Sequence, residues 1–136
     1  MNILILEDDR GRQEKFIQNT VGHVRVITDM VTACIESLKA AIELNNPIDI
    51  LFLDHDLGSH IMQESGPGTG YEVAVWLEEH PRYQPKHIVI HSFNPDGAMR
   101  MNAALPKAVR WPGAWDKDIY AIIEYLEQHT HKEAGI

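Results

Sequence analysis

Short apolar runs alternate along the chain with longer stretches in which apolar residues recur at helical spacing. Residues 2–6 and 50–53 are apolar at almost every position, which is typical of central strands in a parallel sheet covered by helices on both faces. Residues 23–27 alternate between apolar and polar types, which suits a strand nearer the sheet edge. Two further strands are expected over residues 86–92 and 107–111.

Helices are predicted between these strands because their apolar side chains fall on one helical face. Thr28 or Asp29 can cap the second helix, Asp116 can cap the last, and Pro95 suits the first turn of the fourth. The predicted helices run over residues 10–18, from 28 or 29 to about 44, 70–80, 95–105, and from 116 to about 129. This alternation predicts an α/β fold with a doubly wound, five-stranded parallel sheet, flavodoxin-like with strand order 2-1-3-4-5.

Length and charge narrow the class of protein. The 136 residues are expected to form a single domain, with a polar tail from about residue 130. No apolar run approaches the length of a membrane span and the start shows no signal-peptide pattern, so we expect a cytoplasmic protein with no membrane partner. The net charge of −8 disfavours non-specific binding to nucleic acid. Cys34, the single cysteine, is expected to be a core thiol in a reducing compartment. The oligomeric state stays open.

Ionisable side chains follow three predicted strands at the point where each strand ends. The carboxyl ends of central parallel strands lie together, so one cleft is expected to hold ionisable and polar side chains from all three strand ends, with Asp9 left open as a further member. These side chains are Glu7, Asp8, Asp54, Asp56, His91 and Ser92. Several carboxylates this close resist ionising together unless a divalent cation binds them. The expected metal ligands are Glu7, Asp8, Asp54 and Asp56, with Mg²⁺ or Mn²⁺ as the leading ions, although imidazoles widen the choice toward Fe²⁺ or Zn²⁺. Side chains alternate along a strand, so either His55 or Asp56 must point away from this cleft.

Over nearly its whole length the sequence resembles a response-regulator receiver domain. Residues 3–9 look like the first strand of a receiver with its acid pair, carried over to Glu7 and Asp8. Asp54 matches the phosphoacceptor aspartate, and Ser92 matches the switch serine or threonine. Receivers end their fifth strand in a Lys-Pro pair whose lysine binds the phosphoryl group, whereas this chain reads Arg-Trp-Pro over residues 110–112.

Two longer motifs are similar to a narrower group, the cyclic-phosphate processing receiver-like domains. They are Leu-Asp-His-Asp-Leu-Gly over residues 53–58 and His-Ser-Phe-Asn-Pro-Asp-Gly-Ala over residues 91–98. This resemblance implies a cyclic phosphate substrate, such as an ADP-ribose derivative, a nucleotide or an RNA end.

Opening a cyclic phosphodiester needs a nucleophile, charge stabilisation and a proton for the leaving oxygen. The candidate catalytic residues are Asp54, His91 and His55. The two imidazoles suit general acid and base catalysis near neutral pH. Whether water or Asp54 attacks is left open. The phosphate is expected to be held by a separate set of groups, namely Ser92, Asn94, Gly97 and Arg110.

The leading hypothesis is a metal-dependent phosphoesterase acting on a small phosphorylated substrate. The alternatives are a signalling module that takes a phosphoryl group on Asp54 and a non-catalytic module that binds a nucleotide or a partner protein. Trp111 and Trp115 could flank a base or ribose, but packing against the last helix is favoured.

Overall fold

The computed structural model describes residues 1–57 and 64–134, and its centre is a parallel sheet. The strand order β2-β1-β3-β4-β5 confirms the predicted doubly wound, flavodoxin-like arrangement. Every pair of neighbouring strands is parallel. The strands are β1 (Asn2–Leu6), β2 (Val24–Thr28), β3 (Ile50–Leu53), β4 (His87–Ile90) and β5 (Val109–Arg110).

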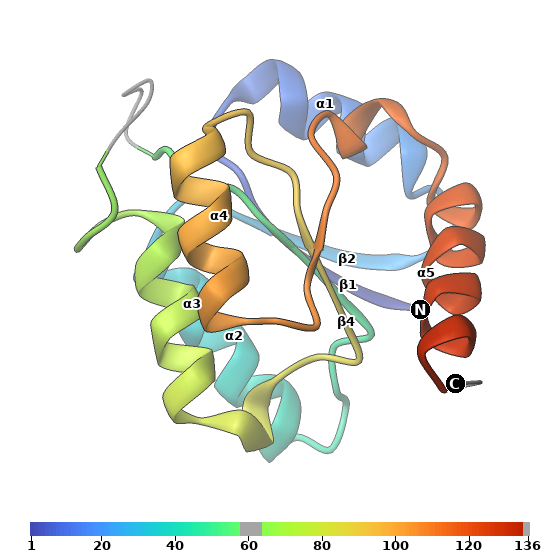
Figure 1. Cartoon of the computed structure of the whole chain (residues 1–136). Coiled ribbons are helices and arrows are strands. Elements are labelled where there is room, and N and C mark those ends of the chain that lie inside the picture. Colours follow the sequence, from blue (N-terminus) through green and yellow to red (C-terminus); the bar gives the residue numbers. More distant parts are fainter. Residues whose placement is uncertain (58–63, 135–136) are drawn as a thin grey trace.

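Helices cover both faces of the sheet, with α2, α3 and α4 on one face and α1 and α5 on the other (Figure 1). The α-helices are α1 (Arg10–Asn19), α2 (Val31–Glu43), α3 (Gly70–Glu79), α4 (Pro95–Ala104) and α5 (Ile119–Ala134). Two short 3₁₀ turns, η1 (Pro81–Tyr83) and η2 (Ala114–Asp116), complete the described elements. Among the described helices, none combines the length and the apolar character needed to cross a membrane.

Alternation along the central strands builds two separate apolar cores. Leu4 and Leu6 of β1 face α2, α3 and α4, whereas Ile3 and Ile5 face α1 and α5. The pattern repeats in β3 and β4, whose side chains are all buried. The two tryptophans near the last helix pack as favoured from the sequence. Trp115 joins the core that includes α5, and Trp111 meets the ring of Tyr125 at 4.9 Å.

Several element boundaries differ from the sequence prediction. Asp116 does not cap the last helix, because it belongs to η2; Asp118 does so instead and accepts the amide of Tyr120 at 2.7 Å. The second helix begins after Met30 with no side-chain cap, and Thr28 ends β2, where its hydroxyl donates to the carbonyl of Ile5. The predicted strands over residues 86–92 and 107–111 shrink to β4 and β5.

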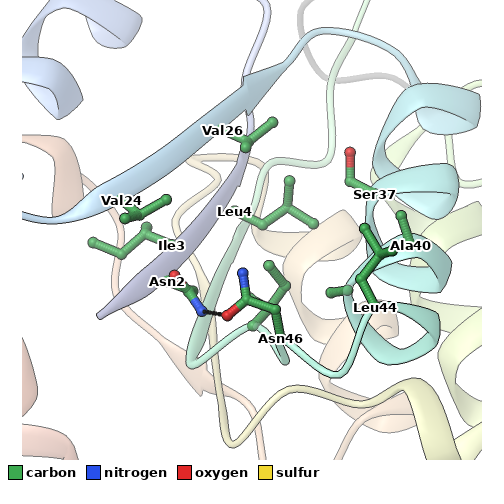
Figure 2. Close-up of a pocket in the computed structure, with 11 residues that line it drawn as sticks. Asn2, Ile3, Leu4, Val24, Val26, Ser37, Ala40, Leu44 and Asn46 are labelled. Atoms are coloured by element: carbon green, nitrogen blue, oxygen red, sulfur yellow. Dashed lines mark hydrogen bonds between the residues drawn. The ribbon is translucent and has the colours of Figure 1, made fainter.

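An apolar pocket of about 210 Å³ lies at the amino ends of β1 and β2, against the last turns of α2 (Figure 2). Its lining includes Leu4, Val24, Val26 and Leu44, and a hydrogen bond of 2.7 Å from Asn2 to Asn46 lies at its edge. None of its lining residues is ionisable. This pocket therefore offers no groups for acid, base or metal chemistry, and it lies at the end of the sheet away from the strand-end acids.

Cys34 should be unreactive in the folded protein. The residue is fully buried, and burial raises the pKa of its thiol to about 12, although the hydroxyl of Thr28 acts in the opposite direction. Because the thiolate is the reactive form, we expect alkylation at mildly alkaline pH to be negligible without denaturant and complete in concentrated guanidinium. Mass spectrometry after a brief iodoacetamide pulse measures this, and equal labelling in the two conditions would contradict the buried position.

Candidate functional site

Glu7, Asp54 and His91 are the first residues after β1, β3 and β4, and alternation turns them to the same face of the sheet. Each continues a row of side chains in the core beneath α1 and α5, following Ile5, Phe52 and Val89. The hydrogen-bonding register of the three strands aligns their ends. The structure therefore brings together three of the residues predicted from the sequence, and all three are buried at 2% exposure or less.

One ligand atom from each of Glu7, Asp54 and His91 lies within 4.8 Å of the other two. His91 Nε2 is 3.1 Å from Glu7 Oε1, and the amide of Asp9 donates to the other Glu7 oxygen at 3.0 Å. The amide of His55 donates to Asp54 Oδ1 at 2.9 Å. These contacts fix the carboxylates at the strand ends and hold their oxygens toward one another.

Aromatic rings enclose the imidazole of His91. The ring of Phe16 lies 5.1 Å away and that of Trp115 lies 5.7 Å away, both edge-on. His91 Nδ1 is buried and has no hydrogen-bond partner among the described residues. Burial lowers the pKa of His91 to about 4, while the charge of Asp54 acts to raise it and that of Arg12 to lower it. The imidazole is therefore neutral at physiological pH, which is the form that binds metal.

The two carboxyl groups are held in an environment that opposes their charge. Burial, helped by the charge of Glu7, raises the pKa of Asp54 to about 7 against the opposing effects of His91, the His55 amide and Arg12. Burial likewise raises the pKa of Glu7. Two carboxylate oxygens and a neutral imidazole nitrogen are a donor set that suits Mn²⁺, Fe²⁺ or Zn²⁺, and Mg²⁺ less well because of the nitrogen. The residues present fit a divalent cation.

Arg12 supplies a cation that the sequence reasoning missed. Asp9 caps α1 by accepting the amide of Arg12 at 2.9 Å, so Arg12 lies in the first turn at the same edge of the sheet. Its Nη1 atom lies 3.8 Å from Glu7 Oε1 and 4.0 Å from Asp54 Oδ2. The usable signal was the spacing of three residues between a capping aspartate at the end of β1 and an arginine.

His55 lies on the opposite face of the sheet from Asp54, beneath the start of α4. Its ring is fully buried; Nδ1 is 2.8 Å from Asp56 Oδ1, and Nε2 is 2.9 Å from the hydroxyl of Ser65. The side-chain amide of Asn94 donates to the same Asp56 oxygen at 3.0 Å. Asp56 therefore belongs with His55, and neither lies in the group formed by Glu7, Asp54 and His91.

His55, Asp56, Ser65 and Asn94 form a second cluster, and the Asn-Pro-Asp-Gly turn over residues 94–97 holds it in place. Asn94 caps α4 by accepting the amide of Gly97 at 3.0 Å, and Ser92 accepts the amide of Asn94 at 3.0 Å. A Cβ atom on Gly97 would lie 2.4 Å from the ring of His55, so only glycine lets α4 approach so closely. Ser92, Asn94 and Gly97 thus carry bonds and contacts of the turn itself.

Two other predicted site residues lie outside the buried group. Asp8 is half-buried and is not part of it. Arg110 pairs with Ile90 and therefore shares the face of α2, α3 and α4, where its side chain is exposed. The geometry favours Arg12 over Arg110 as the cation of this site. Gly58, the last residue of the first motif, lies outside the described residues.

Comparison with known proteins identifies a matching family model and solved structures with a similar fold. The family model described as cyclic-phosphate processing receiver domain matches residues 2–107. The Mn²⁺-bound form of the response regulator Rcp1 is similar with a TM-score of 0.62 at 16% identity, covering 93% of this chain and 89% of that one. A fusion protein carrying residues 181–211 of the yeast Spc42 trimeric coiled coil gives a TM-score of 0.58 at 15% identity, covering 98% and 80%. At such identities these structures show a shared fold. A search of curated protein sequences finds no match.

Substitution of Gly97 tests the close packing of α4 on His55. We expect Gly97→Ala to lower the free energy of unfolding by about 1–3 kcal/mol, because the methyl group must displace a ring held by hydrogen bonds on both nitrogens. Gly66→Ala is the matched control, since an added Cβ there meets nothing within 4 Å. Denaturant unfolding of both variants measures the difference, and equal stabilities would contradict the packing described here.

Asp54→Asn tests the conflict between the buried carboxylates. Because folding raises the pKa of Asp54 from 3.8 to about 7, the folded state loses stability as the pH rises from the first value to the second, and the full penalty applies above about pH 7. With chelator present and above that pH, we expect the variant to be more stable than wild type by on the order of 1 kcal/mol or more. We also expect it to lose most of the rise in melting temperature that Mn²⁺ gives the wild type.

Thermal unfolding with chelator and with excess Mn²⁺ measures both effects. Glu124→Gln is the control, because it makes the same change from carboxylate to amide at an exposed position of α5. A variant less stable than wild type without metal, or one that responds fully to Mn²⁺, would refute this description of the site.

Proposed function

This chain belongs to the family of cyclic-phosphate processing receiver domains, and from that premise we propose that it is a metal-dependent phosphoesterase that opens a cyclic phosphate. One observation carries the proposal. Glu7, Asp54 and His91 converge in a buried group of metal-ligand geometry, and Arg12 lies beside its two carboxylates. Oxygen and nitrogen donors next to a guanidinium suit a phosphate ester, which needs charge stabilisation on several oxygens at once.

Glu7, Asp54 and His91 would hold the metal. When bound there, a divalent cation supplies Lewis-acid polarisation of the phosphoryl group and lowers the pKa of a bound water. Among the protein's own groups, Arg12 would stabilise the negative charge that develops on the phosphoryl oxygens. A guanidinium suits this task because its planar donors match two phosphate oxygens.

The reaction adds water to phosphorus and breaks one ring P–O bond. The water loses a proton, the leaving alkoxide gains one, and the product is an acyclic phosphomonoester. His55 would act as a positioning residue, since it is buried on the far face and its amide donates to Asp54 Oδ1. Direct attack by Asp54 would instead form an aspartyl phosphate, as in receivers that take up a phosphoryl group.

The first experiment is a panel of cyclic phosphates followed by phosphorus NMR, which detects ring opening directly. The panel contains 2′,3′-cyclic nucleotides and a cyclic phosphate of ADP-ribose, each with Mn²⁺, with Mg²⁺ and with chelator. We expect metal-dependent ring opening that falls at least about a hundredfold in Asp54→Ala and His91→Ala, because metal sites lose up to this much even from outer-shell changes. Glu124→Gln is the control.

The outcomes separate the competing functions. Unchanged turnover in Asp54→Ala and His91→Ala would remove the proposed site. If no compound reacts, but acetyl phosphate labels the wild type and not Asp54→Asn, the chain is a phosphoaccepting module. If neither reaction occurs, a non-catalytic binding module remains.

A further inference from the structure

Phe93 is an exposed aromatic residue in a segment that is otherwise buried. It follows His91 and Ser92 at the end of β4, where its neighbours are exposed by 0%, 2% and, at Asn94, 5%. The side chain of Phe93 is 53% exposed. Exposure of a large apolar ring beside a polar site gives no gain to the core, and such rings often serve as contact surfaces for ligands.

The ring of Phe93 is held in place from two sides. It meets the ring of Trp115 edge-on at 5.1 Å with the planes at 90°, and the guanidinium carbon of Arg12 lies 5.6 Å from its centre. Arg12 also lies 4.4 Å over the ring of Trp115. A Cβ atom on Gly113 would lie 3.5 Å from the Phe93 ring. The orientation of Phe93 is therefore fixed by packing that spans α1, η2 and the turn after β4.

Arg12 links this ring to the buried acids. Its guanidinium faces Glu7 and Asp54 through Nη1, and one third of its side chain is exposed. Arg12 therefore lies beside both the buried acids and the Phe93 ring. Arg12, a cation that can bind phosphate, thus lies next to Phe93, a flat apolar surface on which a ring can stack.

We propose that Phe93 stacks on the base of a nucleoside whose 2′,3′-cyclic phosphate is bound by Arg12. This rests on the proposed function and names its substrate class. In such a compound a single pentose separates phosphate from base, so the two can lie against neighbouring side chains such as Arg12 and Phe93, whose guanidinium carbon and ring centre are 5.6 Å apart. In an ADP-ribose cyclic phosphate on the distal ribose, a second pentose and a pyrophosphate separate the two groups, so its adenine does not reach Phe93 in this pose. Aromatic side chains stack on every base, so little preference among bases is expected.

The experiment compares two substrates that differ in the base alone. These are adenosine 2′,3′-cyclic phosphate and 1-O-methylribose 2,3-cyclic phosphate, which has a methoxy group where the base would be. We expect the wild type to prefer the adenosine compound in kcat/KM by about tenfold or more, which is within the range for one stacked base. Phe93→Ala should abolish most of this preference, and Phe93→Trp should keep it because a stacking surface remains. Tyr120→Ala, an exposed aromatic on α5, is the control.

A binding measurement separates this inference from the proposed activity. Calorimetry uses adenosine 2′-monophosphate, an acyclic phosphomonoester of the kind that ring opening would produce. Its binding can be measured without any turnover. We expect Phe93→Ala to weaken binding about tenfold and Arg12→Ala to weaken it at least as much, with Arg100→Ala, an exposed arginine of α4, as the control. Ribose 2-phosphate should bind Phe93→Ala and wild type with more similar affinities than the adenosine compound does.

Each outcome is decisive. Ring opening without a preference for the adenosine compound, or a preference that survives Phe93→Ala, overturns the role of Phe93 and leaves the phosphoesterase standing. Absence of ring opening combined with adenosine 2′-monophosphate binding that depends on Phe93 and Arg12 keeps the nucleotide site and overturns the phosphoesterase. Absence of both overturns both.

Discussion

The main electrostatic cost in this structure is the burial of two carboxylates that lie close together at the end of a parallel sheet. Glu7 and Asp54 are both removed from water, and neither charge favours the other. Three kinds of group lower this cost by donating hydrogen bonds or positive charge to the acids: the neutral imidazole of His91, two backbone amides and the guanidinium of Arg12. None of them neutralises both acids fully, since the pKa of each acid stays raised. Ionising both acids would leave more negative charge than Arg12 alone offsets, and a bound cation could balance it.

Strand alternation divides the chemistry of the Asp-His-Asp segment between the two faces of the sheet. Asp54 faces α1 and α5 with the acid group, while His55 faces α4 and bonds to Asp56. The second cluster is fully occupied by its own contacts, from Ser65, Asn94 and the close approach at Gly97. It holds β3 and α4 together and thereby fixes the strand end that carries Asp54. The segments 53–58 and 91–98 thus each provide one member of the buried group, Asp54 and His91, and each also contributes residues to the cluster on the other face.

The fold and the core of the site could be predicted because they follow from local patterns. Apolar runs and strand order are enough to bring Glu7, Asp54 and His91 to one edge of the sheet. The rest depends on strand register and on the geometry of the first helical turn, which the pattern of apolar residues does not specify. Arg110 was predicted as the phosphate cation, but its register with Ile90 sends it to the other face. Arg12 was missed because its position depends on how Asp9 caps α1, a detail of the first helical turn.

The cation beside the acids, Arg12, comes from α1 and not from the end of β5, so different parts of the structure hold it in position. A lysine at the end of the fifth strand, as in receivers, is held by the sheet, whereas Arg12 is held by a helix and by the rings of Trp115 and Phe93. The same guanidinium lies close to both carboxylates, so it competes with a metal for them. In the proposed function, a metal that takes up the carboxylate charge would weaken the hold on Arg12 and leave its donors for an anion. Metal and phosphate would then favour each other's binding through a single side chain, which would let the site accept a charged phosphate ester despite the net charge of −8.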